Sequence, residues 1–211
     1  MSIATLILGQ SGTGKSTSLR NLNPADVLLI QAIKKPLPFR SKDWQPLTKD
    51  GGNVYVCDAA AKICQVIEKT QKQIIVIDDF QYIMANEFMR RTAERGFDKF
   101  TDIGKAAWDI FNAASAAADG KRIYILSHTE QSESGVTKLK TIGKMLDEKI
   151  TLEGMVTICL RTSVTNGVYE FSTQNNGSDT VKSPIGLFES ERIDNDLAAV
   201  DAAIVEYYGL A

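Results

Sequence analysis

Short, continuous runs of apolar residues recur along the chain and predict buried strands. Residues 4–8 and 74–77 are almost wholly apolar or β-branched, which is the pattern of a strand covered on both faces of a parallel sheet. Shorter runs predict further strands at residues 27–30, 53–57 and 123–126. These five strands are the expected frame of the fold.

Between the strands, apolar positions recur every three or four residues, which is the spacing of one helix face. This pattern predicts helices at residues 15–22, 59–72, 80–94, 101–118 and 194–208. The helix at 101–118 has the clearest buried stripe, formed by Ile103, Ala107, Ile110, Phe111, Ala114 and Ala117. Alternation of strands and helices predicts an α/β fold, with a mostly parallel sheet flanked by helices.

The pattern changes in the last third of the chain. Residues 131–141 are polar and contain a glycine, so we expect a mobile loop, followed by a short helix near 143–149. Asn166-Gly167 separates two β-rich runs, which is a strong hairpin signal. These runs, at residues 155–163 and 168–173, predict a C-terminal hairpin that extends the sheet. No repeat or linker divides the sequence, so residues 1–211 are expected to form a single domain.

The composition mainly excludes certain partners and kinds of site. The 211 residues are 44% hydrophobic and 24% charged, with a net charge of −2. These values describe an ordinary globular protein without global attraction to nucleic acid or anionic lipid. His128 is the only histidine, which excludes a histidine-based metal site. No apolar run approaches the roughly 20 residues of a membrane span, so we expect a cytoplasmic protein with no membrane partner.

The residues after the first strand carry the strongest chemical signal. They fit the pattern G-x-x-x-x-G-K-[ST], in which backbone N–H groups cradle phosphates. Lys15 is expected to reach the β- and γ-phosphates, and Ser16 to ligate Mg²⁺. A glycine-rich turn with a chance lysine is the alternative, but a strand before the motif and a helix after it favour a nucleotide site. The expected phosphate-binding residues are Gly9, Gln10, Ser11, Gly12, Thr13, Gly14, Lys15, Ser16 and Thr17.

Two acidic residues follow the strand at 74–77. Asp78 is predicted to hold Mg²⁺ through a water, with helix N-cap as its alternative role. Asp79 either polarises the attacking water as a general base or caps the helix. Asp58, after the strand at 53–57, competes for the same role as base, with turn formation as its alternative. The sequence leaves the choice between Asp58 and Asp79 open.

Residues after the strand at 123–126 suggest a link between nucleotide and nucleic acid. His128 ends this strand, where it could sense the γ-phosphate, or it could be an ordinary partly buried histidine. Lys138 and Lys140 follow in the polar loop and would suit single-stranded DNA binding. The basic residues 33–42, with aromatic side chains close by, offer a second candidate surface.

The motifs occur in the order of a RecA-like ATPase core. Segments such as KKPLPF, DDFQYIMANEFMRR, KTIGKMLDEKITLEGM and TQNNGSDTVKSP resemble those of short phage ATP-binding proteins, the Sak-type single-strand annealing ATPases. The resemblance implies ATP and Mg²⁺ at the interfaces of a ring or filament of identical subunits. It further implies single-stranded DNA on residues 131–141, and Lys182 reaching a neighbour's γ-phosphate. Asp58 stands where the family has glutamate, which predicts slow or DNA-stimulated hydrolysis.

The sequence therefore predicts a phage DNA recombination protein that binds and hydrolyses Mg-ATP, binds single-stranded DNA and promotes annealing. Its expected location is the cytoplasm of an infected bacterium, with a single-strand-binding protein as a candidate partner. Two alternatives remain. A small nucleotide kinase shares the strand–loop–helix motif, but it needs an arginine-rich lid, and only Arg90, Arg91 and Arg95 cluster here. An ATP-switched loader or adaptor for a replication partner is the other.

Overall fold

An eight-stranded sheet forms the centre of the computed structural model, which describes residues 1–210 apart from the side chains at 147 and 148. Its strand order is β10-β9-β8-β1-β5-β4-β2-β3. The six strands from β8 to β3 in this order are parallel, and β9 and β10 continue the sheet in antiparallel pairing. The sheet strands are β1 Ile3–Leu8, β2 Val27–Gln31, β3 Val54–Val56, β4 Ile74–Asp78, β5 Arg122–Ser127, β8 Ile158–Thr165, β9 Val168–Ser172 and β10 Arg192–Asp194.

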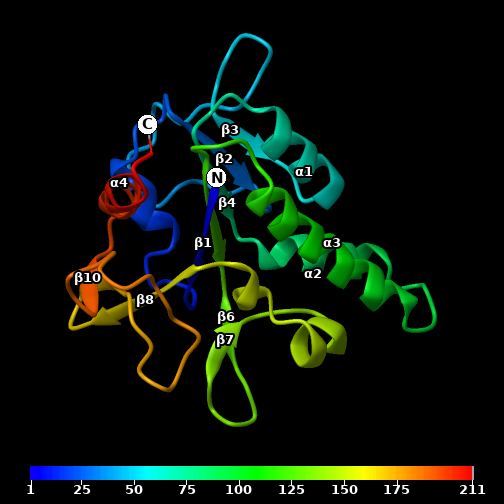
Figure 1. Cartoon of the computed structure of the whole chain (residues 1–211). Coiled ribbons are helices and arrows are strands. Elements are labelled where there is room, and N and C mark those ends of the chain that lie inside the picture. The colour runs from blue at the N-terminus through cyan, green and yellow to red at the C-terminus, as the bar shows by residue number, and fades with distance from the viewer. Residues whose placement is uncertain (211) are drawn as a thin grey trace.

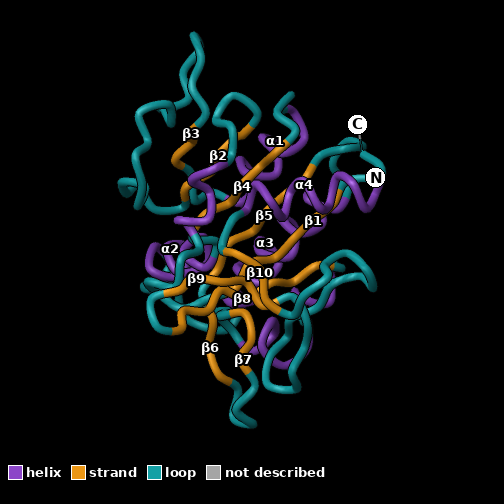
Figure 2. The backbone as a smooth tube through the Cα atoms, turned by 90° about the vertical axis from the view of Figure 1, so that its left-hand side faces the viewer, coloured by secondary structure: helices purple, strands orange, loops and turns teal. Residues whose placement is uncertain are grey.

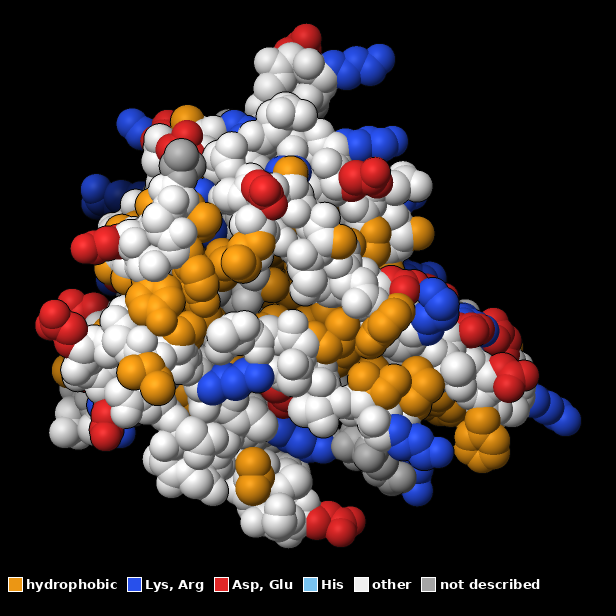
Figure 3. Space-filling model, viewed as in Figure 1, with side chains coloured by type: hydrophobic (Ala, Val, Ile, Leu, Met, Phe, Trp, Pro, Cys, Tyr) orange, Lys and Arg blue, Asp and Glu red, His pale blue; other side chains and the backbone are white. Residues whose placement is uncertain are grey.

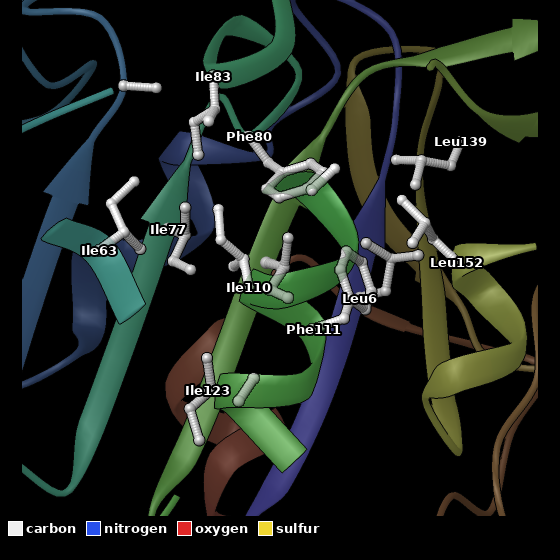
Figure 4. Close-up of a cluster of buried hydrophobic side chains, with 14 of the residues drawn as sticks. Leu6, Ile63, Ile77, Phe80, Ile83, Ile110, Phe111, Ile123, Leu139 and Leu152 are labelled. Atoms are coloured by element: carbon white, nitrogen blue, oxygen red, sulfur yellow. The ribbon is translucent and has the colours of Figure 1, made fainter. Parts of the chain in front are cut away.

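Helices cover both faces of this sheet (Figure 1). One face carries α1 Ala60–Lys69, α2 Gln81–Arg90 and α3 Asp98–Ser115, and the other carries η1 Ser16–Asn21 and α4 Leu197–Tyr208. Alternate residues of each strand point to opposite faces. In β1, Leu6 packs toward α3, whereas Ile7 lies in the cluster under α4. Figure 4 shows Leu6 beside Phe111 of α3.

The predicted mostly parallel α/β fold with a C-terminal hairpin is therefore confirmed. The helix expected at residues 15–22 is instead the short 3₁₀ segment η1. Ser18 explains part of this difference, because its Oγ donates to the Lys15 carbonyl at 2.6 Å. Such local side-chain bonds compete with helix formation, and Pro24 prevents a longer helix.

The polar segment expected to be a mobile loop also differs. It forms an antiparallel ribbon of β6 Thr129–Gln131 and β7 Thr137–Leu139, which projects from the lower end of the molecule in Figures 1 and 2. Both strands are three residues long and mostly polar, so they lack a detectable hydrophobic period. The π-helical turn η2 Met145–Lys149 and the 3₁₀ turn η3 Leu152–Met155 then lead to β8.

A buried ionic network fastens α4 to the sheet. Arg122 on β5 donates from Nε and Nη2 to Asp201 on α4 at 2.8 and 3.2 Å, and Tyr124 Oη donates to the same carboxylate at 2.6 Å. All three side chains are buried, and burial together with the Asp201 charge raises the pKa of Tyr124.

Among residues 1–210, no helix is long and apolar enough to cross a membrane.

Candidate functional site

The glycine-rich loop lies at the carboxyl edge of β1, between the ends of β5 and β8. Gly9 N donates to Ser127 O at 3.1 Å, and Thr162 of β8 approaches from the other side. A Cβ added to Gly9 would lie 1.8 Å from Thr162 Oγ1, so the close approach of β8 requires glycine. Gly14 has φ +97°, a left-handed conformation that glycine adopts without strain. Sheet pairing and backbone geometry together fix the shape of this loop.

Lys15 lies at the centre of the loop. Its Nζ donates to the carbonyls of Gly9 and Gln10, each at 2.8 Å, and the residue is only 6% exposed. Burial lowers the pKa of Lys15 to about 8, although Asp79 and Asp78 act in the opposite direction. An ammonium group held by backbone carbonyls within a glycine-rich loop is positioned to meet phosphate oxygens.

Ser16 joins the loop to β4. Its Oγ donates to both carboxylate oxygens of Asp78 at 2.9 Å, although the two residues are 62 positions apart. Asp78 is 1% exposed, and burial, with the neighbouring Asp79, raises its pKa. The side chain faces the loop and does not cap α2, whose first turn has no side-chain cap. The structure therefore brings together the two predicted metal-site residues.

This pair of oxygen donors fits Mg²⁺. Magnesium prefers oxygen ligands and usually keeps several waters, so protein sites supply only one or two side chains and leave the rest to phosphates. Within the described part of the chain, no group of three or more His, Cys, Asp or Glu residues could form a complete cage. Ser16 and Asp78 are thus suited to a metal that arrives with a phosphate ligand.

Asp79 is the most constrained acidic residue of the site. It has φ +61° and is 3% exposed. Its carboxylate forms an ion pair with Lys35 and lies 3.6 Å from Nε2 of His128. Burial raises the pKa of Asp79, but hydrogen bonds from His128 and Lys35 outweigh it and lower the pKa overall. Asp79 is therefore an ionised carboxylate in the loop cavity, and the side chains of Lys35 and His128 both lie close to it.

His128 connects this site to the β6–β7 ribbon. Its ring is partly buried and meets Tyr82 edge to face, with 6.3 Å between the ring centroids. Its backbone carbonyl accepts a hydrogen bond from Lys140 N at 2.9 Å. Lys140 itself is exposed, whereas Lys138 is half-buried and lies 3.8 Å from Glu130. The residue beside Asp79 is thus bonded directly to the predicted DNA-binding segment.

The structure does not bring Asp58 to this site. Asp58 follows β3, the edge strand, and four strand spacings of about 4.8 Å place β3 about 19 Å from β1. The Asp58 carboxylate accepts hydrogen bonds from Asn86 and Arg90 of α2, at 2.7 and 2.8 Å. These bonds, working against burial, lower its pKa. Within one subunit, Asp79 lines the cavity over the loop, and Asp58 does not.

Lys182 is also outside the loop region of its own chain. Its backbone pairs with Cys159 on β8, through two hydrogen bonds of 2.8 and 2.9 Å. This pairing lies two residues before Arg161, which is in register with the end of β1. The expected polar loop is therefore fixed to the sheet at this point.

Four residues that line the site were not predicted from the sequence as site residues: Lys35, Pro36, Pro38 and Tyr169. A cavity of 260 Å³ lies over the loop, and Lys35 and Tyr169 are among its walls. Tyr169 comes from the hairpin strand β9 and approaches Gly14, together with the buried Asn195. The basic run at 33–42 pointed to Lys35 only as part of a surface. The cavity is lined by Ser11, Gly12, Gly14, Lys15, Ser16, Thr17, Lys35, Pro36, Pro38, Asp79, His128 and Tyr169.

Comparisons with known proteins add little to this geometry. No family model matches the chain, and no curated protein matches it. A solved structure with detectable similarity is the X-ray structure of the Legionella pneumophila ATPase DotB, with 14% identity and a TM-score of 0.41. The match covers 97% of this chain and 52% of that chain, so the chain spans about half of its length. Similarity at this level does not indicate a function.

Proposed function

We propose that this chain binds Mg-ATP and hydrolyses it. The observation that carries the proposal is the Ser16–Asp78 hydrogen bond beside the buried Lys15. It joins the phosphate-binding loop to the acidic end of β4 in the arrangement used for phosphoryl transfer. Mg²⁺ held by Ser16 and Asp78 would neutralise charge on the phosphate oxygens. Lys15 binds the β- and γ-phosphates, and Asp79 orients the attacking water.

The finer proposal is a phage recombination protein of the Sak type, which binds single-stranded DNA and promotes annealing. The bond from Lys140 N to His128 O supports a path by which the nucleotide site influences the β6–β7 ribbon. Measuring ATP turnover with and without single-stranded DNA tests this function. Strong stimulation by DNA is expected, and turnover that ignores DNA contradicts the recombination role.

The subunits are proposed to assemble with ATP at their interfaces, where Lys182 acts on the nucleotide of a neighbour. Exposed apolar side chains support self-association: Ile185, three residues after Lys182, is 98% exposed, and Phe97 is 85% exposed. Hydrophobic side chains also gather on the face shown in Figure 3. Contact in trans is compatible with the position of Lys182 outside the loop region of its own chain.

A second candidate function is phosphoryl transfer to a small acceptor, as in a kinase. One observation favours it: a cavity of 560 Å³ adjoins the loop cavity and shares Lys35 and Pro36 with it. Trp44 and Val54 give this second cavity apolar walls suited to a planar ligand. Formation of a nucleoside diphosphate from ATP and a nucleoside monophosphate would favour this function over annealing.

Asp78→Asn should impair magnesium use without abolishing nucleotide binding. The amide keeps an oxygen for Ser16 but removes the charge that attracts the metal. Losses of about 10- to 100-fold in metal affinity are typical when such support is removed, so the Mg²⁺ concentration for half-maximal turnover should rise by about that factor. Asp50→Asn, which changes an exposed loop residue, is the matched control. Normal Mg²⁺ dependence in Asp78→Asn would exclude Asp78 from the metal site.

The double variant Lys138→Ala, Lys140→Ala should weaken binding to single-stranded DNA. Removing one phosphate–lysine ion pair lowers the slope of log affinity against log salt by roughly 0.7 for a single strand, so the slope should fall by up to about 1.4. A titration of fluorescent oligonucleotide at several salt concentrations measures it. The control is Lys49→Ala, Lys62→Ala, which removes the same charge from exposed positions elsewhere. If both double variants bind DNA alike, the ribbon is not the DNA surface.

A further inference from the structure

Lys35 enters the loop cavity from a separate part of the chain. It follows β2, and its carbonyl accepts a hydrogen bond from Gln31 Nε2 at 3.1 Å. Gln31 lies in register with Asp78 on β4, and Ala32 N donates to Asp78 O at 3.2 Å. The backbone of Lys35 is therefore anchored beside the acidic end of β4, while its side chain reaches over the loop.

The ion pair between Lys35 and Asp79 is asymmetric. The Asp79 side chain is 4% exposed and the Lys35 side chain is 39% exposed. Asp79 is further fixed by its left-handed backbone and by His128. A lysine ammonium group is carried on a flexible four-carbon stem and can turn to a new partner. If the pair exchanges partners, Lys35 is the member that moves.

Charge balance indicates what the new partner is. Lys15 and Lys35 are the two lysines among the described residues that line the cavity, and Asp78 and Asp79 oppose them with two carboxylates. Lys15 lies deep in the loop, where it reaches the β- and γ-phosphates from one side. A triphosphate adds one more charged group than a diphosphate does. Lys35 is the second lysine of the cavity and supplies the further positive charge that balances it.

We propose that Lys35 leaves Asp79 to bind the terminal phosphate of a nucleoside triphosphate within the same subunit. This exchange makes the site discriminate a triphosphate from a diphosphate. It also frees the Asp79 carboxylate to hold the attacking water, which couples recognition of the terminal phosphate to hydrolysis. The inference rests on the proposed function, because it assigns a role within the same nucleotide site.

Calorimetry with Lys35→Met tests the exchange, using a non-hydrolysable ATP analogue and ADP, each with Mg²⁺. Methionine keeps most of the apolar stem. Loss of a charge-assisted hydrogen bond should weaken binding of the analogue about tenfold or more, and change ADP binding less than about twofold. Lys49→Met, in the same connection between β2 and β3 but with an exposed side chain, should bind both nucleotides as the parent protein does.

A double-mutant cycle separates exchange from simple attraction. Asp79→Asn removes the competing carboxylate, so it should tighten binding of the analogue more when Lys35 is present than in the Lys35→Met background. Equal tightening in both backgrounds overturns the exchange. Lys35→Met that loses as much affinity for ADP as for the ATP analogue overturns it as well. If a variant is unfolded by circular dichroism, Lys35→Arg replaces it and should retain the triphosphate preference. Failure of the parent protein to bind either nucleotide instead overturns the proposed function.

Discussion

Lys15→Ala should abolish ATP turnover, with a fall of about a thousandfold or more. Removing one preorganised group that stabilises developing charge costs about 10²- to 10³-fold, and phosphoryl transfer depends on such groups even more strongly. Lys15 Nζ lies at 2.8 Å from two carbonyls in the middle of the loop, and no other lysine among the described loop residues can replace it. Phosphate release measured at saturating Mg-ATP checks the result.

The same variant should bind nucleotide about 10- to 100-fold more weakly, the usual loss for one charged hydrogen bond. Lys15 is buried, so a thermal melt must accompany the assay to show that the domain is still folded. Lys49→Ala controls for loss of a positive charge at an exposed position. Affinity equal to that of the parent protein in folded Lys15→Ala would overturn the assignment of the phosphate-binding loop.

Asp201→Ala should cause the largest loss of stability, about 3 to 5 kcal/mol. The change leaves the buried Arg122 guanidinium without the carboxylate that receives two of its hydrogen bonds, and it removes the partner of Tyr124 as well. For a domain of this size, each kcal/mol lowers the melting temperature by about 2 to 4 °C. Urea denaturation also measures the loss, because a lower free energy of unfolding moves the midpoint to a lower urea concentration.

A double variant tests whether the uncompensated charge causes that loss. Replacing both partners, in Arg122→Met, Asp201→Leu, removes the buried charge altogether, and such apolar replacements are often neutral or stabilising. The double variant should be more stable than Asp201→Ala. A free energy of unfolding for Asp201→Ala within about 1 kcal/mol of the parent protein would show that α4 does not depend on this network.

Local sequence pattern predicted the elements of the fold better than their arrangement. The runs at β1, β4 and β5 are buried on both faces, and burial of that kind leaves a continuous apolar run in the sequence. The pattern carries no information on which strands pair. The position of β5 between β1 and β4, which brings His128 beside Asp79, came only from the structure.

In the site, too, local features were predictable from the sequence and the long-range arrangement was not. The proximity of Lys15, Ser16 and Asp78 was predictable because the motif has fixed residue types at a defined spacing next to a buried strand. Lys35 and Tyr169 were not, because a loop and a hairpin deliver them from a distance. Asp58 was expected near the phosphates because it follows a strand, but it bonds to Asn86 and Arg90 of α2 and does not line the loop cavity. The order of strands in the sheet therefore decides which strand ends contribute to the site.

The position of β1 between β5 and β8 also affects how the chain folds during synthesis. Ile3 pairs with Arg122, and Thr5 pairs with Ile158. At 5 to 20 residues per second, a ribosome needs about 6 to 24 s to make the first partner strand after β1 has emerged. During that interval an apolar strand has neither neighbour, and such segments are prone to aggregate. Chaperones that shield nascent chains are therefore expected to engage this protein before its sheet can close.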